Sequence, residues 1–198
     1  HVPAVACDAV IQPCDPVRRG KRFALSCGRE PLASDPPDVV VVLGADCAFV
    51  PGSLGALASV AADGTPAQAV NPLYPDRKAH PLIQISSFAL LVKNLIRARG
   101  TTRLGGAALL TGTGMAFNWK TFAEAPLATG DIVEDLGLGL SFLRAGIRPR
   151  LVEQAQVRSA PAGLADAQGQ RRRWEHGFLT TALRQSPRLL LRGLTTGS

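Results

Sequence analysis

Acidic residues in two parts of the sequence have positions that suit catalysis. Asp46 closely follows Asp38–Leu43, an apolar, valine-rich run that predicts a strand, and Glu134 and Asp135 stand near the start of a helix predicted at 131–144. A carboxylate at a strand end can bind Mg²⁺ or Mn²⁺ together with phosphate oxygens. A carboxylate beside a hydroxyl can remove its proton as a general base. Two simpler interpretations stay open: a turn-forming aspartate, and acidic residues that favour a helix N-terminus.

A polar and aromatic set lies in the run Gln-Arg-Arg-Arg-Trp, within a helix predicted at 165–184. Gln170, Arg173 and Trp174 are spaced i, i+3 and i+4, so they share one face of that helix. A guanidinium can hold a diphosphate with paired hydrogen bonds, and an indole can form the apolar floor of a site for a ring. Consecutive arginines also occur on ordinary solvated faces, and that interpretation stays open as well.

Two glycine-containing segments have the backbone freedom to approach a ligand. Lys21 follows Gly20 in a basic loop that lacks the spacing of a phosphate-binding P-loop. The run Thr111–Gly114 reads Thr-Gly-Thr-Gly, and its glycines, Gly112 and Gly114, either line a site or allow tight backbone geometry. Neither segment identifies a function alone.

The elements that position these residues alternate between strands and helices. The run at 38–43 shows no polar alternation, which is typical of a strand buried on both faces. It would place Asp46 at the carboxyl end of a central strand, where open α/β sheets bind ligands. Other segments predict a strand-loop-strand at 107–117, strands at 67–70 and 150–157, and helices at 51–62 and 80–99, the second stopped by Gly100. This alternation predicts an α/β fold with a mostly parallel or mixed sheet and helices on both faces.

The composition limits the class of protein. The 198 residues suit one domain, 1–198, and the formal net charge of +7 favours anionic partners such as phosphates, nucleic acid or an acidic membrane surface. No aromatic series accompanies the arginines, so nucleic acid is not expected. No apolar run reaches the roughly 18 residues of a membrane span, but the basic, apolar tail at 184–198 is expected to contact a membrane interface. The four cysteines form no CxxC pair, which argues against a metal cluster.

In order and type, these residues resemble the membrane-associated branch of family 2 glycosyltransferases, which includes cellulose and hyaluronan synthases and ceramide glucosyltransferase-like enzymes. The resemblance covers about residues 15–177 and rests on a Gly-Lys loop, an aspartate at a strand end, a Glu-Asp pair and a QxxRW motif. Members of that branch have a GT-A fold, an α/β sandwich around a mixed sheet. The resemblance therefore implies a GT-A-like catalytic domain that serves polysaccharide biosynthesis.

The resemblance also implies a reaction and a set of roles. The chain would be an inverting, hexosyltransferase-like enzyme on the cytoplasmic side of the cell membrane, moving a sugar from a UDP-sugar or related donor to a glycan or lipid acceptor. Asp46 would hold Mg²⁺ or Mn²⁺ on the donor diphosphate, and Asp135 would be the general base, positioned by Glu134. The substrate-binding residues would be Lys21, Gly112, Gly114, Gln170, Arg173 and Trp174.

Two departures from the family pattern keep other interpretations open. Gly44 stands where the family often has the first aspartate of an Asp-x-Asp motif, and the family's first βα unit is not recognisable. Without that unit, one edge of the sheet is expected to be exposed. The first alternative is a non-catalytic or truncated domain of this type, which binds nucleotide or glycan without turnover. The second alternative is a basic module that binds nucleic acid or an acidic membrane.

Overall fold

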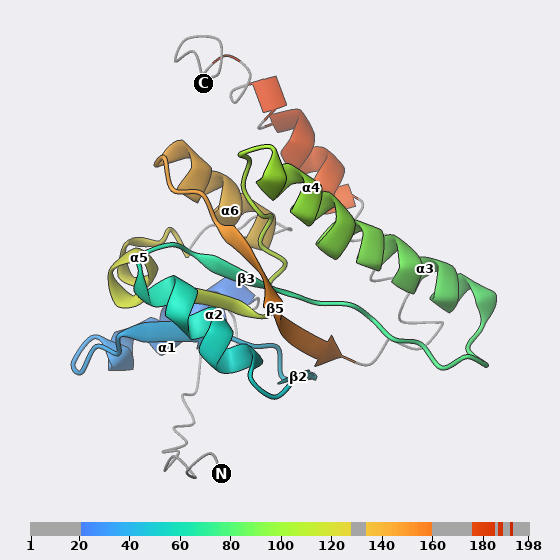
Figure 1. Cartoon of the computed structure of the whole chain (residues 1–198). Coiled ribbons are helices and arrows are strands. Elements are labelled where there is room, and N and C mark those ends of the chain that lie inside the picture. Colours follow the sequence, from blue (N-terminus) through green and yellow to red (C-terminus); the bar gives the residue numbers. More distant parts are fainter. Residues whose placement is uncertain (1–20, 128–133, 160–175, 185, 188–190, 192–198) are drawn as a thin grey trace.

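The computed structural model describes residues 21–127, 134–159, 176–184, 186–187 and 191 (Figure 1). Gln170, Arg173 and Trp174 lie outside the described residues, as do most of 184–198 and the side chains of Lys21 and Glu134. The helices are α1 (Lys21–Leu32), α2 (Ser53–Ala62), α3 (Pro81–Leu91), the π-helical η1 (Val92–Arg97), α4 (Ala98–Arg103), α5 (Trp119–Glu124) and α6 (Glu134–Arg144). The strands are β1 (Val39–Val42), β2 (Cys47–Phe49), β3 (Ala67–Val70), β4 (Met115–Asn118) and β5 (Arg150–Ser159). Residues 176–184 are also helical.

The five strands form one mixed sheet in the order β1-β4-β3-β5-β2. Of the neighbouring pairs, β3 and β5 are parallel, whereas β1 with β4, β3 with β4, and β2 with β5 are antiparallel. The α/β fold with a mixed sheet is thus confirmed, although its parallel part is smaller than the alternation of elements suggests. The expected central position of β1 is wrong, because among the described strands β1 pairs with β4 alone and lies at an edge.

Helices cover both faces of this sheet, as predicted. Successive side chains of β4 point to opposite faces: Phe117 packs with the rings of Phe122 and Phe142, at centroid distances of 6.2 and 5.8 Å, in a core with side chains of α5 and α6. Ala116 faces the other core, in which Leu57 and Ala61 of α2 pack against the strands. The sheet residues of this second core are mostly small, which lets α2 lie close over the strands (Figure 1); they are Ala67, Ala69, Ala116, Val152, Ala155 and Val157.

The long helical segment α3–η1–α4 is continuous from Pro81 to Arg103 and contains one π-helical stretch. His80 caps its start, because its imidazole Nδ1 accepts a hydrogen bond from the backbone N–H of Leu82 at 3.2 Å. The predicted end at residue 99, before Gly100, is wrong by four residues, because the helix ends at Arg103. Gly100 is tolerated inside the helix, and the chain turns only at Gly105, whose φ of 78° lies in the left-handed region that glycine adopts readily.

Two more sequence predictions need correction. Residues 107–110 form no strand, so the segment at 107–117 contributes only β4, and the short strand β2 was not predicted at all. The apolar run at 107–110 is therefore not a strand, and β2 has only three residues and is defined by its pairing with β5. Within the part of the chain that the structure describes, no helix has the length and hydropathy needed to cross a membrane.

Candidate active site

Asp46 lies in a tight turn that connects β1 to β2. The turn is closed by a hydrogen bond from the backbone N–H of Cys47 to the carbonyl of Gly44, at 3.0 Å. The Asp46 side chain is exposed, and its Oδ1 accepts a hydrogen bond from the Cys47 thiol at 3.3 Å. The predicted carboxylate at the end of β1 is therefore available to a ligand from solvent.

The glycine-containing loop Thr111–Gly114 lies against this turn. Thr113 is buried, and its hydroxyl oxygen accepts a hydrogen bond from the backbone N–H of Gly44 at 3.0 Å. This hydrogen bond joins two residues that are 69 positions apart in the sequence, and it lies at one end of the sheet. The structure brings together two predicted site elements, the Asp46 turn and the loop that carries Gly112 and Gly114.

The backbone of the loop explains its glycines. Gly112 and Gly114 have φ angles of 79° and 62°, which other residues rarely adopt. A Cβ at Gly114 would also lie 2.6 Å from Cγ2 of Val157 and 3.0 Å from the Cβ of Ala69. Tight backbone geometry is therefore the observed role of these glycines, and their contact with a substrate stays a prediction.

Gln68 forms hydrogen bonds to the backbone of the Thr111–Gly114 loop, and it was not among the predicted site residues. This residue of β3 is only 2 % exposed. Its amide nitrogen donates to the carbonyls of Ala69, Thr113 and Gly114 at 2.8, 2.9 and 3.3 Å, and its carbonyl oxygen accepts from the N–H of Thr111 at 2.9 Å. A buried amide is stable only when its hydrogen bonds are made. The available signal was a glutamine in the middle of the short apolar strand Ala-Gln-Ala-Val.

Asp135 lies in the first turn of α6, which packs along the segment leading into the loop. A Cβ at Gly139 would lie 3.6 Å from Leu110, and the chain after α6 returns to Ala108, whose N–H donates to the carbonyl of Pro149 at 2.8 Å. The helix therefore runs antiparallel to residues 107–111 and directs its first turn toward the end where the loop lies. Asp135 is half-buried there, and its Oδ1 accepts from the N–H of Leu136 at 2.9 Å.

Lys93 of η1 adds a cation at this end that the sequence analysis did not assign to the site. Loss of water around its ammonium group lowers the pKa of Lys93, Arg97 lowers it further, and the nearby charge of Asp135 acts in the opposite direction. The ammonium also lies 5.9 Å from the centre of the Phe178 ring. Lys93 thus connects η1 electrostatically to the start of α6 and to the helix at 176–184.

Two buried oxygen atoms at this end have no hydrogen-bond partner among the residues that the structure describes: Oδ1 of Asn71, just after β3, and Oγ1 of Thr111 at the start of the loop. Unpaired buried atoms of this kind are usually satisfied by water or a ligand. Among the described residues, no group of three or more metal-binding side chains comes together. Within the described ranges, Asp46 is thus not part of a metal site made by three or more such side chains.

Other predicted residues are not brought to this site by the described contacts. Lys21 begins α1, which packs on the sheet through Leu25 and is joined to the end of α5 by Arg29, whose guanidinium donates to the carbonyls of Ala123 and Ala125 at 2.9 and 3.0 Å. The QxxRW residues lie outside the described part of the chain, so their placement stays a prediction.

Comparison with known protein families gives one match, to the family described as "Glycosyl transferase family group 2", over residues 39–197. The chain belongs to this family. The match covers the Asp46 turn, the Thr111–Gly114 loop, the acidic pair and the QxxRW residues, but it begins after Lys21. No curated protein matches the chain.

Membership in this glycosyl transferase family supports transfer of a glycosyl group, with a nucleotide-sugar donor and an acceptor as the substrates. It also agrees with the observed fold, a mixed sheet covered by helices as in a GT-A-like domain. The resemblance to family 2 glycosyltransferases is thereby confirmed at the level of the family. The cellulose and hyaluronan synthase branch stays a prediction.

Proposed function

We propose that this chain is the catalytic domain of an inverting glycosyltransferase that moves a sugar from a UDP-linked donor to a glycan or lipid acceptor. The observation that carries the proposal is the hydrogen bond between Gly44 and Thr113, which holds the turn bearing Asp46 against the glycine-containing loop. The first turn of α6, with Asp135, lies toward the same end of the sheet. One carboxylate is thus available for the donor and another for the acceptor.

Asp46 is the residue we propose for a divalent cation on the donor diphosphate. Mg²⁺ and Mn²⁺ prefer oxygen ligands, and Mg²⁺ is commonly bound by one or two carboxylates together with substrate phosphates and water. A single exposed carboxylate fits a cation that binds jointly with the donor. When bound, such a cation would stabilise the negative charge that develops on the departing nucleotide.

Asp135 is the residue we propose as general base. The acceptor hydroxyl attacks the anomeric carbon while the bond from that carbon to the donor diphosphate breaks, and the hydroxyl proton passes to the Asp135 carboxylate. One displacement of this kind inverts the anomeric configuration. Support comes from the half-buried position of Asp135 in the first turn of α6, which is directed toward the end of the sheet where the loop lies, and from the cation Lys93 nearby.

The helix at 176–184 supports the proposed role of the QxxRW residues. Phe178 of this helix lies beside Lys93, and Trp174 is only four residues before Phe178 in the sequence. A short length of chain therefore connects the motif to the end of the molecule where Asp135 lies. We propose that Gln170, Arg173 and Trp174 bind the donor diphosphate and the acceptor, and that Lys21 contributes to donor binding. We also propose that the enzyme acts at the cytoplasmic face of a membrane.

Calorimetric titration of UDP, with and without Mn²⁺, tests the donor site. We expect binding that requires Mn²⁺ and is lost in Asp46→Ala, because the cation would have no protein ligand left. Asp63→Ala is the matched control, since this exposed aspartate follows α2 at the opposite end of β3. Binding of UDP that is unaffected by Mn²⁺ and by Asp46→Ala would refute the proposed metal site. Absence of UDP binding under both conditions would argue against the proposed enzyme.

A second pair of variants tests whether Gly44 limits cation binding. A Cβ at this position would lie 2.9 Å from Oδ1 of Asp46 and 3.0 Å from Sγ of Cys47, which are both side-chain ends that can rotate away. Gly44→Asp places a second carboxylate two residues before Asp46, and Gly44→Asn adds the same bulk without charge. We expect Gly44→Asp to bind UDP with Mn²⁺ more tightly than Gly44→Asn does. Equal affinities would show that residue 44 does not face the cation.

A further inference from the structure

The segment α3–η1 carries a row of apolar side chains that face solvent. Their exposed fractions are 44 % for Leu82, 62 % for Ile85, 66 % for Phe88, 39 % for Val92 and 54 % for Ile96. The spacing of three or four residues places all five on one side of the helix. We call this row the α3–η1 stripe.

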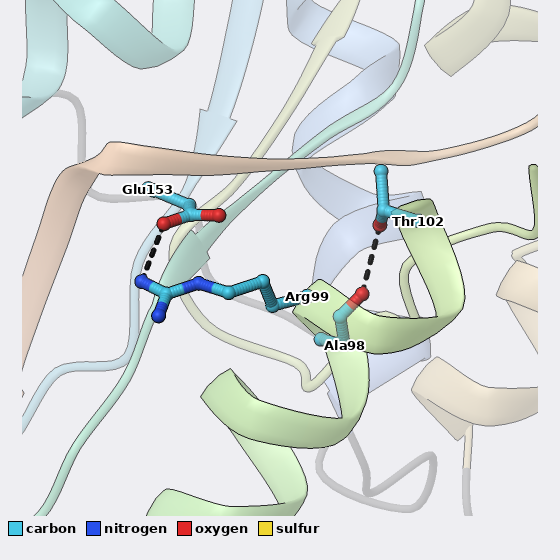
Figure 2. Close-up of polar contacts among 4 residues, drawn as sticks. All are labelled: Ala98, Arg99, Thr102 and Glu153. Atoms are coloured by element: carbon cyan, nitrogen blue, oxygen red, sulfur yellow. Dashed lines mark hydrogen bonds and ion pairs between the residues drawn. The ribbon is translucent and has the colours of Figure 1, made fainter. Parts of the chain in front are cut away.

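The opposite side of the same helix is attached to the body of the molecule. Ser87 and Ala98 are buried, and the side chain of Asn94 donates to the backbone carbonyl of Asn71 at 3.2 Å. Arg99 forms an ion pair with Glu153 of β5, and Figure 2 shows the two side chains pointing toward one another. These contacts fix the rotation of the helix and keep the stripe directed outward.

The neighbouring helix at 176–184 also carries exposed apolar side chains. It lies beside the long helix in Figure 1, and the contact between Lys93 and the Phe178 ring joins the two. Leu179 and Leu183 are 61 % and 77 % exposed. Two neighbouring helices thus carry exposed apolar side chains, and the five of the α3–η1 stripe are more than the scattered single residues of an ordinary surface.

The charge around the stripe favours an anionic partner. Residues 77–103 contain no aspartate or glutamate and six basic residues, Arg77, Lys78, Lys93, Arg97, Arg99 and Arg103. Exposed members lie beyond both ends of the stripe, with Arg77 and Lys78 before it and Arg103 after it. Basic side chains near an exposed apolar face are attracted to the negative surface of an anionic bilayer, and the apolar side chains can enter its headgroup region. Basic residues stand within the helix and near both of its ends. A helix with this distribution of charge is suited to lie on a bilayer rather than to cross one.

We propose that the α3–η1 stripe, together with Leu179 and Leu183, docks this domain on an anionic membrane surface. This surface is separate from the tail at 184–198 and does not depend on the proposed roles of Asp46 and Asp135. Since Lys93 of η1 lies near Asp135, docking would hold the start of α6 close to the lipid headgroups. The membrane would thereby orient the proposed catalytic end toward acceptors at the interface.

Flotation of the full chain with vesicles tests this proposal, using phosphatidylcholine alone and phosphatidylcholine with phosphatidylglycerol. We expect binding to the anionic vesicles that weakens with salt, and about a tenfold or greater loss of binding in the double variant Ile85→Asn and Phe88→Asn. The matched control is Leu54→Asn, which removes a 51 % exposed leucine from α2 on the other side of the sheet. Circular dichroism establishes that each variant is folded, and UDP binding separates loss of docking from loss of the donor site.

Three results would overturn the proposal. Wild-type protein that does not float with anionic vesicles has no such docking surface. Vesicle binding that survives in the double variant but disappears when the chain is cut after Leu183 would assign docking to the tail. A dimer in analytical ultracentrifugation that is lost in the double variant, without vesicle binding by the wild type, would make the stripe a contact between two copies of the chain.

Discussion

Replacement of Gln68 by leucine tests whether a buried amide holds the glycine-containing loop in place. Leucine has a similar volume, so Gln68→Leu removes the hydrogen bonds of the side chain without opening a large cavity. Three of these bonds are 2.8–2.9 Å long, to Ala69, Thr113 and Thr111. At about 1 kcal/mol net for each intramolecular hydrogen bond, their loss amounts to about 3 kcal/mol of the free energy of unfolding. For a chain of this size, that corresponds to a fall in Tm of about 6–12 °C.

Urea denaturation and thermal melting measure this effect. The matched control is Gln154→Leu on β5, where the glutamine is exposed and a change within about 0.5 kcal/mol is expected. If Gln68→Leu costs less than about 1 kcal/mol, the loop is held by its own backbone and the bonds to Gln68 contribute little net stability. A loss of stability equal to that of Gln154→Leu would refute the reasoning outright.

Other predictions concern the loop, an ion pair and the proposed base. Gly114→Ala should destabilise the fold by about 2 kcal/mol or more, because φ of Gly114 is 62° and the new Cβ would clash with Val157. Gly55→Ala in α2 is the control: no atom lies within 4 Å of the new Cβ, so this change should stabilise the fold by up to about 1 kcal/mol. Arg99 lowers the pKa of Glu153, so the stability from this pair is present above the ordinary glutamate pKa and is lost as pH falls through the lowered value. The Tm difference between wild type and Glu153→Gln should therefore be present at neutral pH and vanish in acid. Asp135→Asn should lower kcat about 100- to 10,000-fold, measured as UDP release, without loss of UDP binding.

Local pattern predicted those parts of the fold that are determined by a single stretch of chain. The valine run gave β1, because an uninterrupted apolar run bounded by turn residues is a local signal, and Ala67–Val70 gave β3 although Gln68 interrupts its apolar residues. The direction and order of strands depend on partners far away in the sequence. β4 pairs antiparallel with both β1 and β3, and no local feature of Met115–Asn118 indicates this. The edge position of β1 was missed for the same reason.

The candidate site shows the same division between side-chain motifs and the contacts that assemble them. Asp46 and Asp135 could be identified from the sequence because a carboxylate side chain can bind a cation or accept a proton. The position of the Asp46 turn against the loop depends on contacts of another kind: the backbone N–H of Gly44 donates to the Thr113 hydroxyl, and the buried amide of Gln68 donates to the Thr113 carbonyl. Backbone N–H groups and side-chain amides and hydroxyls occur throughout every sequence, so no sequence motif indicates which of them form these hydrogen bonds. A substitution at Thr113 or Gln68 could therefore disturb the proposed site as much as one at a carboxylate, although neither residue is proposed to touch a substrate.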